Sequence, residues 1–208
     1  MKQKSTHLIG KFLYQLYQSN PEAADKIGQI ILQQIKQSGY LFKEQLAKEG
    51  EIPAIRAVHQ KVDQLVLEKL KDVKEPVSCR RGCAACCHIE VDINPFEAAL
   101  IVNYCKKNKI AIDKEYLRWQ RKHTKRQRLY SQQSACVFLI NKECSIYPVR
   151  PIACRKYLVV SPPEHCDVKN GVREVSVVFL REVEIMLSGI LRVVQDGKMA
   201  DMLLEVMK

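Results

Sequence analysis

The sequence predicts a mainly α-helical fold, with helices packed around an irregular, cysteine-rich centre. Apolar residues recur at helical spacing in both terminal thirds, Asn-Pro-acid patterns mark helix starts, and the middle third combines eight cysteines with several prolines. At 208 residues and 47% hydrophobic composition the chain can bury a real core. We expect one compact domain with three parts: an N-terminal helical region (1–75), a cysteine module (76–171) and C-terminal helices (172–208).

Three helices are expected before the module. Residues 7–18 form a short amphipathic repeat, and the Asn-Pro pair that begins at Asn20 caps a second helix. We expect Gly39 to end that helix, since glycine favours helix C-termini. Pro53 begins a third helix that runs to about Asp72.

Further helix signals follow the first cysteines. Asn94 and Glu97 have the spacing of a capping box, which predicts a helix to about Lys107. A second helix is expected over residues 113–130. Residues 131–171 should be mostly loop, and helices are expected over 174–195 and 198–207, parted by Asp196-Gly197.

Eight of the nine cysteines fall into two groups of four, and Cys105 stands apart. The early and late groups are, in order, Cys79, Cys83, Cys86 and Cys87, then Cys136, Cys144, Cys154 and Cys166. Buried free thiols and disulfides are the ordinary alternatives. Buried thiols need no close spacing, whereas metal ligands repeat every two to four residues because a short loop folds around one ion. The spacing therefore predicts a metal-stapled centre.

Zinc and a four-iron cluster both accept four thiolates, so the metal stays open between zinc and iron, including an iron–sulfur centre. Neighbouring side chains diverge, so Cys86 and Cys87 should face different partners. We expect two centres, or one larger one, that clamp residues 79–88 to residues 136–166.

Histidines and arginines near the cysteines are secondary candidates. His88 and His165 each adjoin a cysteine, so either has the position to replace a thiolate. His59 stands alone at helical spacing, which indicates a structural role. The arginines flanking the cysteines would favour deprotonated thiols, or else be solvated surface groups. These are Arg80, Arg81, Arg150 and Arg155.

The motif Cys79-x3-Cys83-x2-Cys86-Cys87, followed by Cys136-Val-Phe-Leu and by Cys144-Ser-Ile-Tyr-Pro-Val-Arg-Pro-Ile-Ala-Cys154-Arg, resembles a known family. The family is the CxxxCxxCC zinc- or iron-chelating domain of YkgJ-like cysteine-cluster proteins. The resemblance covers about residues 77–168 and departs from the pattern at Val137, where the family has proline. It implies metal chelation without a defined reaction.

Two other classes of function stay open. Flagellin lysine N-methylases carry a similar cluster, so an iron–sulfur-dependent enzyme, either an oxidoreductase or a protein lysine methylase-like one, is an alternative. No serine–histidine–acid set, phosphate loop or dinucleotide fingerprint supports catalysis. An adaptor is the third class. Basic residues dominate 118–128, with Tyr116 and Trp119 beside them, so this stretch is either a solvated face or a surface for an acidic protein or nucleic acid.

No apolar run of about 18 residues occurs, so we expect no membrane span. The first residues lack the pattern of an export signal, which favours a cytoplasmic location. In that reducing compartment thiols bind metal more often than they form disulfides. The formal net charge of +11 would fall if thiolates bound a divalent ion.

Overall fold

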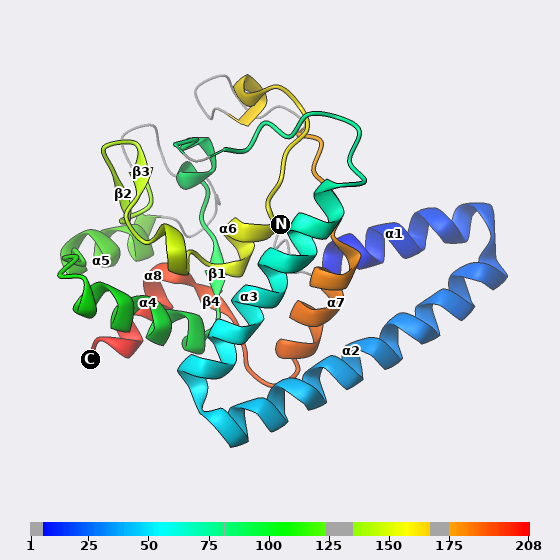
Figure 1. The fold of residues 1–208 in the computed structure, drawn as a ribbon, viewed down its shortest axis with the longest axis horizontal. Helices are drawn as coiled ribbons and strands as arrows, with labels where there is room; N and C mark the ends of the chain where they lie inside the picture. The colour runs from blue at the N-terminus through cyan, green and yellow to red at the C-terminus, as the bar shows by residue number, and fades with distance from the viewer. Residues whose placement is uncertain (1–5, 81, 124–134, 167–174) are drawn as a thin grey trace. The chain divides into compact units, whose positions relative to one another are not determined.

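The computed structural model describes residues 6–80, 82–123, 135–166 and 175–208 and is mainly α-helical, as the sequence predicts (Figure 1). It divides into two compact units, one of Met1–Ala54 with Phe179–Gln195 and one of Ile55–Val178 with Asp196–Lys208. In the described residues, no helix is long and apolar enough to cross a membrane.

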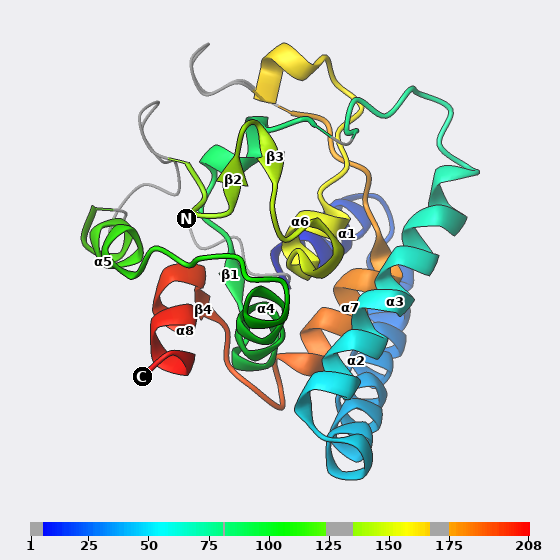
Figure 2. The ribbon, with the colours of Figure 1, turned by 60° about the vertical axis from the view of Figure 1, so that its left-hand side comes forward.

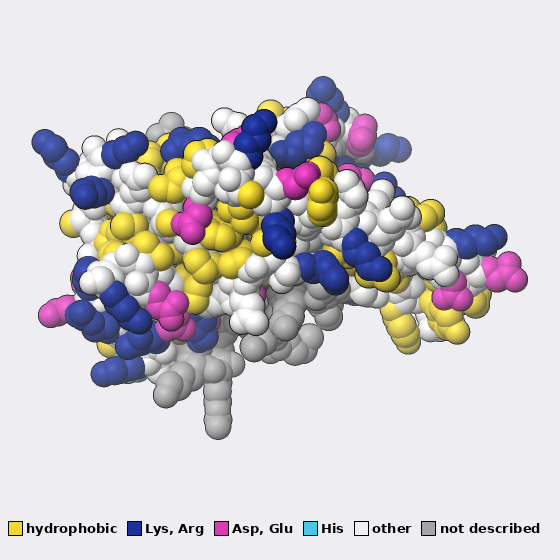
Figure 3. Space-filling view, turned by 90° about the horizontal axis from the view of Figure 1, so that it is seen from below, with side chains coloured by type: hydrophobic (Ala, Val, Ile, Leu, Met, Phe, Trp, Pro, Cys, Tyr) yellow, Lys and Arg dark blue, Asp and Glu magenta, His cyan; other side chains and the backbone are white. Residues whose placement is uncertain are grey.

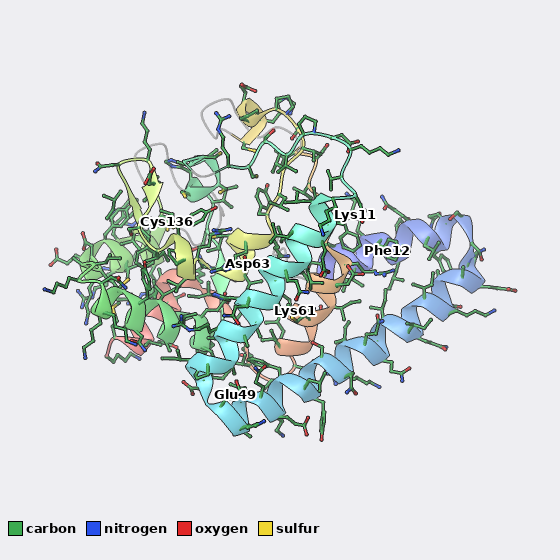
Figure 4. All side chains as sticks on the ribbon, viewed as in Figure 1. Lys11, Phe12, Glu49, Lys61, Asp63 and Cys136 are labelled. Carbon is green, nitrogen blue, oxygen red and sulfur yellow. The ribbon has the colours of Figure 1, made fainter. Side chains whose placement is uncertain are left out.

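The first unit consists mainly of three helices, α1 (Thr6–Ser19), α2 (Pro21–Glu49) and α7 (Arg181–Ile190). Helix α2 packs against both α1 and α7. Ile9, Ile31 and Ile185 form its buried centre, one from each helix. At the edge of this centre Phe12, labelled in Figure 4, stacks on Phe179 with ring centroids 5.7 Å apart. The unit is thus held together by hydrocarbon burial.

The predicted cap at Asn20 is confirmed, because its side chain accepts a hydrogen bond from the Ala23 amide at 3.0 Å. The predicted end at Gly39 is wrong, since α2 continues to Glu49. Gly39 serves close packing instead. A Cβ atom there would lie 2.8 Å from the carbonyl oxygen of Gly189 in α7, so a glycine is needed at this contact.

The second unit holds most of α3 (Glu51–Leu70) and the remaining elements of the chain. Its helices are α4 (Pro95–Lys107), α5 (Lys114–His123), α6 (Ile152–Lys156) and α8 (Met199–Val206). Helix α8 packs against α4 and α5, and Figure 2 shows α4 and α8 side by side. Strand β1 (Asp92–Ile93) pairs antiparallel with β4 (Gly197–Lys198) beside them. Strands β2 (Leu139–Ile140) and β3 (Glu143–Cys144) form a hairpin.

Residues 131–171 were expected to be mostly loop, and the described part is indeed built from short pieces. Besides the hairpin and α6 it contains the 3-10 turns η2 (Tyr147–Val149) and η3 (Pro163–Cys166). A further 3-10 turn, η1 (Ala85–His88), carries part of the early cysteine group. The predicted helix 113–130 is present as α5 up to His123. Its remaining residues, 124–130, lie outside the described part of the chain.

The predicted helix over 174–195 is too long, because α7 begins only at Arg181. Residues before it are extended and pair with the segment after α6. The Val178 amide donates to Leu158 O at 2.9 Å, and Val159 forms a bridge with Val177. Tertiary pairing therefore replaces the helix that the apolar pattern favours.

Glu97 joins three elements of the second unit. With Asn94 it forms the predicted capping box at the start of α4, in which the Glu97 amide donates to Asn94 Oδ1 at 3.0 Å. Its Oε1 also accepts from the Ile152 amide of α6 at 2.8 Å and lies 3.3 Å from His59 Nε2 of α3. His59 is buried here, as expected for a structural histidine.

Candidate metal centre

The early cysteines lie on a segment that pairs with the residues after α6. Ser78 N donates to Val159 O at 2.8 Å, and the Ser78 hydroxyl donates to Ser161 O at 2.7 Å. The Cys79 thiol lies 3.5 Å from Tyr157 O and accepts from the Val159 amide at 3.3 Å. These bonds fix Cys79 beside the segment that follows α6 and Cys154.

The remaining early cysteines follow a tight bend. Gly82 has φ of 84°, a conformation that glycine adopts without strain, and the Cys83 amide donates to Arg80 O at 3.0 Å. Turn η1 then carries Cys86 and Cys87. The Cys136 amide donates to Cys87 O at 2.7 Å, so the backbone of the first late cysteine is bonded directly to that of the last early one.

Three of the four late cysteines lie on short elements. Cys144 is in the β2–β3 hairpin, where it pairs with Leu139, and Asn141 and Lys142 at the turn both have positive φ. Cys154 lies on α6, which Glu97 anchors at Ile152. Cys166 ends η3, and η3 packs against η1.

The thiols of the two groups lie close enough to affect one another's ionisation. Burial raises the pKa of Cys136 to about 12, and the charges of Cys144 and Cys86 add to the rise. Burial likewise places the pKa of Cys154 well above its usual value, with contributions from Cys86, Cys136 and Cys144.

The other two late cysteines show the same coupling. Burial raises the pKa of Cys144, and Cys86 adds to the rise. Burial raises the pKa of Cys166, with Cys79, Cys83 and Cys86 adding to the rise. Each late cysteine therefore has an early cysteine as an electrostatic neighbour, which is the juxtaposition that a clamp between the groups requires.

Cys86 is an electrostatic neighbour of all four late cysteines. Its hydrogen bond with the Cys87 thiol is the largest cause of its strongly raised pKa, and burial follows. The two adjacent thiols thus contact each other. Their assignment to different partners stays a prediction for the metal-bound protein.

The arginines have separate roles. Arg150 lies near Cys86 and Cys144 and partly opposes the rise of their pKa, and its guanidinium carbon is 3.9 Å from the Tyr147 ring centroid. Arg155 instead forms an internal link. It is 4% exposed and donates to Asp63 Oδ2 at 2.6 Å and to Arg150 O at 2.9 Å, with Asp63 labelled on α3 in Figure 4.

Arg80 is exposed, and Arg81 lies outside the described residues. Arg150 is the described arginine whose charge is seen to lower the pKa of Cys86 and Cys144.

Tyr157 belongs to the site although the sequence did not single it out. Burial raises its pKa, and the thiols of Cys166, Cys86 and Cys79 add to the rise. Its position three residues after Cys154 was the available signal. Cys105, by contrast, is a buried free thiol in α4 at 1% exposure, as predicted.

The donor set fits a thiophilic metal. All nine cysteines are free, and the eight of the two groups are partly exposed. Among the described residues, no three His, Cys, Asp or Glu side chains already stand in a coordination geometry. Protonated thiols carry no charge that would hold them around a common centre. When they ionise, a cation must compensate the negative charge of the thiolates.

Comparison with protein families agrees with this donor set. Residues 78–173 match the model of the CxxCxxCC family, described as "Putative zinc- or iron-chelating domain". The chain is thus similar to this family over residues 78–173. In the matched region three residues separate Cys79 from Cys83, one more than in the family's name. No curated protein and no solved structure matches the chain.

Proposed function

We propose that the chain chelates zinc or iron through the CxxCxxCC domain and that the metal clamps its two cysteine groups together. The ligands are the thiolates of Cys79, Cys83, Cys86, Cys87, Cys136, Cys144, Cys154 and Cys166. The observation that carries the proposal is the contact between the segments that hold the two groups, because the Cys136 amide donates to Cys87 O at 2.7 Å and η3, which ends at Cys166, packs against η1.

The local fold supports a clamp. The described parts of segments 78–88, 136–144 and 154–166 contain two-residue strands, short 3-10 turns and the end of α6, which make few regular hydrogen bonds. Metal binding supplies folding free energy to such irregular segments, since the ligands gather only in the folded state. The raised thiol pKa values agree, because clustered thiolates repel one another until a cation is bound.

The residues around the cluster have distinct tasks. Glu97 and Arg155 fix α6, which carries Cys154. The hydrogen bond from the Cys136 amide to Cys87 O fixes the backbone just before the β2–β3 hairpin. Arg150 places a positive charge near Cys86 and Cys144 and so favours a net negative centre. Zinc supplies a fixed cross-link, whereas an iron–sulfur cluster supplies a redox-active one.

Free thiols are compatible with a reducing compartment, so we place this function in the cytoplasm. Anaerobic purification of the full chain with metal analysis and a visible spectrum tests the proposal. Stoichiometric zinc in colourless protein, or iron with acid-labile sulfide in brown protein, supports it and identifies the metal. Protein that contains neither zinc nor iron, and takes up neither on reconstitution, contradicts it.

A second function is favoured by α5, whose exposed side combines aromatic and basic residues. The rings of Tyr116 and Trp119 stack at 5.7 Å, those of Trp119 and His123 at 4.6 Å, and Trp119 is 39% exposed. Arg118 and Lys122 are exposed beside them. Figure 3 shows Lys and Arg side chains, in dark blue, spread over the face seen from below. We infer a surface that binds an acidic protein.

Salt-dependent binding to polyglutamate tests this second function. Replacing Arg118 and Lys122 with glutamine should weaken the binding and leave metal content and stability within about 0.5 kcal/mol of the wild type. Wild-type protein that does not bind polyglutamate at low salt contradicts the proposal, and preferential binding to duplex RNA would assign the face to nucleic acid instead.

A further inference from the structure

Two side chains of α5 hold the backbone of Ala135, the residue before Cys136. Tyr116 Oη accepts from the Ala135 amide and donates to the Ala135 carbonyl, both at 2.9 Å. Gln120 Nε2 donates to the same carbonyl at 2.6 Å. A carbonyl oxygen has two lone pairs, so these two donors use both of them.

Helix α5 is a fixed support for this contact. It packs against α8, and its Leu117 and Gln120 are both 0% exposed. Tyr116 and Gln120 lie four positions apart on the helix, so their side chains are neighbours on one face. The two side chains therefore reach Ala135 from an element whose own position is set by packing.

The peptide group between Ala135 and Cys136 is bonded at both of its polar atoms. Its carbonyl is bound by α5, and its N–H donates to Cys87 O in η1 at 2.7 Å. The peptide group after Cys136 is also held, because Cys136 O accepts from the Leu139 amide at 2.9 Å.

These bonds define the direction in which Cys136 presents its side chain. Peptide groups are planar, so fixing the one before a residue and the one after it fixes the direction of the Cα–Cβ bond between them. The Cys136 thiol is then left with rotation about χ1 among a few staggered positions. Without the bonds from α5, the first of the two peptide groups is held only through its N–H.

We propose that Tyr116 and Gln120 are positioning residues for the thiolate of Cys136. This inference rests on the proposed chelating function and adds to it two residues that are not ligands. A ligand that is already directed in the metal-free chain loses less conformational freedom on binding, so the hydrogen bonds that direct it raise metal affinity. Loss of such supporting partners typically weakens metal binding about 10–100-fold.

Anaerobic zinc competition on the metal-free, full-length chain tests this role. Tyr116→Phe removes only a hydroxyl, and Gln120→Met replaces the buried amide with an apolar side chain of similar length. The double variant should bind Zn²⁺ at least about tenfold more weakly than the wild type. Each single variant should lose less, because Ala135 O keeps one donor. If the wild type takes up iron alone, Fe²⁺ replaces Zn²⁺ in the comparison.

Two controls accompany the affinity measurement. Tyr104→Phe removes a hydroxyl from α4 and should match the wild type. Alkylation of the zinc-loaded proteins, followed by mass spectrometry, should show that Cys136 loses protection in the double variant while Cys154 keeps it. A general loss of structure would expose both thiols, so the pair reports on positioning.

A double-mutant cycle with Cys136→Ser gives the decisive readout. When the thiolate is absent there is nothing for α5 to position, so adding Tyr116→Phe and Gln120→Met should change zinc affinity by no more than about twofold. Tyr116→Phe alone serves in the same cycle if the combined variant does not fold.

The outcomes separate the positioning role from the chelating function. An equal loss of affinity with and without the Cys136 thiol overturns the role of α5, as does unchanged affinity in the double variant, and both leave chelation intact. Cys136→Ser that binds zinc like the wild type overturns it too, since Cys136 is then no ligand. A wild-type chain that binds neither zinc nor iron contradicts the chelating function, and the positioning role with it.

Discussion

The helical first unit and the cysteine module are stabilised in different ways. In the unit of α1, α2 and α7, Ile9, Ile31 and Ile185 fill the centre, and two glycines bring helix backbones together. In the module the side chains that converge are thiols, on strands of two residues and turns of three or four. Hydrocarbon burial stabilises the first region, whereas the thiolates proposed for the second would in addition require a positive charge that compensates them.

Removal of the metal gives the largest expected difference between the two regions. Chelation of the purified protein should abolish hydrogen-exchange protection in residues 79–88 and 136–166, while the amides of α1, α2 and α7 keep most of theirs. Structural zinc supplies about 10–16 kcal/mol in small zinc-binding peptides, so the loss should be obvious by mass spectrometry. Uniform loss of protection along the chain would show that the regions do not differ in this way.

A single thiol substitution should have a smaller effect of the same kind. Cys154→Ser removes a ligand from the late group and should lower both bound metal and the free energy of unfolding by several kcal/mol. Cys105→Ser is the matched control, since this thiol is buried in α4 away from the cluster. It should keep full metal content. Equal metal in both variants would contradict the ligand assignment.

Gly39→Ala should destabilise the helical unit alone. The added Cβ would meet Gly189 O at 2.8 Å, and overpacking of this kind typically costs about 1–3 kcal/mol. Gly28→Ala in the same helix is the control, because its Cβ would be 3.9 Å from the nearest atom, Leu13 Cδ1. This substitution should stabilise the unit by about 0.5–1 kcal/mol. Denaturant unfolding measures both, and metal content should not change in either.

Lys142→Gly gives the smallest expected effect and acts on the module. Lys142 has φ of 65° in the β2–β3 turn, a region that glycine occupies more easily, so the hairpin that carries Cys144 should gain about 0.5–1 kcal/mol. The melting temperature of the metal-free protein measures the gain. A decrease would mean that the Lys142 side chain contributes more to the hairpin than the strained turn costs.

Local sequence chemistry predicted the helix starts but not the contacts between distant residues. The caps at Asn20 and Asn94 need only a side chain and an amide three residues on, and both are present. The role of Gly39 depends on Gly189, which is 150 positions away, so a helix-stop interpretation failed. Residues 175–178 have an apolar helical pattern, yet pairing with Leu158 and Val159 keeps them extended.

The candidate site was predictable to a similar degree. Cysteine spacing identified the two groups, because ligand loops are short and leave a local signature. Which late thiol approaches which early one depends on the paths of α6, η3 and the hairpin. Tyr157 had only its position three residues after Cys154 as a signal, so the three-dimensional structure was needed to reveal its place near the thiols.

The first unit is assembled from residues on both sides of the module, which links its stability to chain entropy. Its two halves are joined by residues 55–178, or 124 residues. A metal shared by the proposed ligands Cys79 and Cys166 would leave about 38 residues of this connection outside the link. The entropic cost of closing the connection would then fall by about 1 kcal/mol. The proposed metal would thus stabilise helices that contain no cysteine.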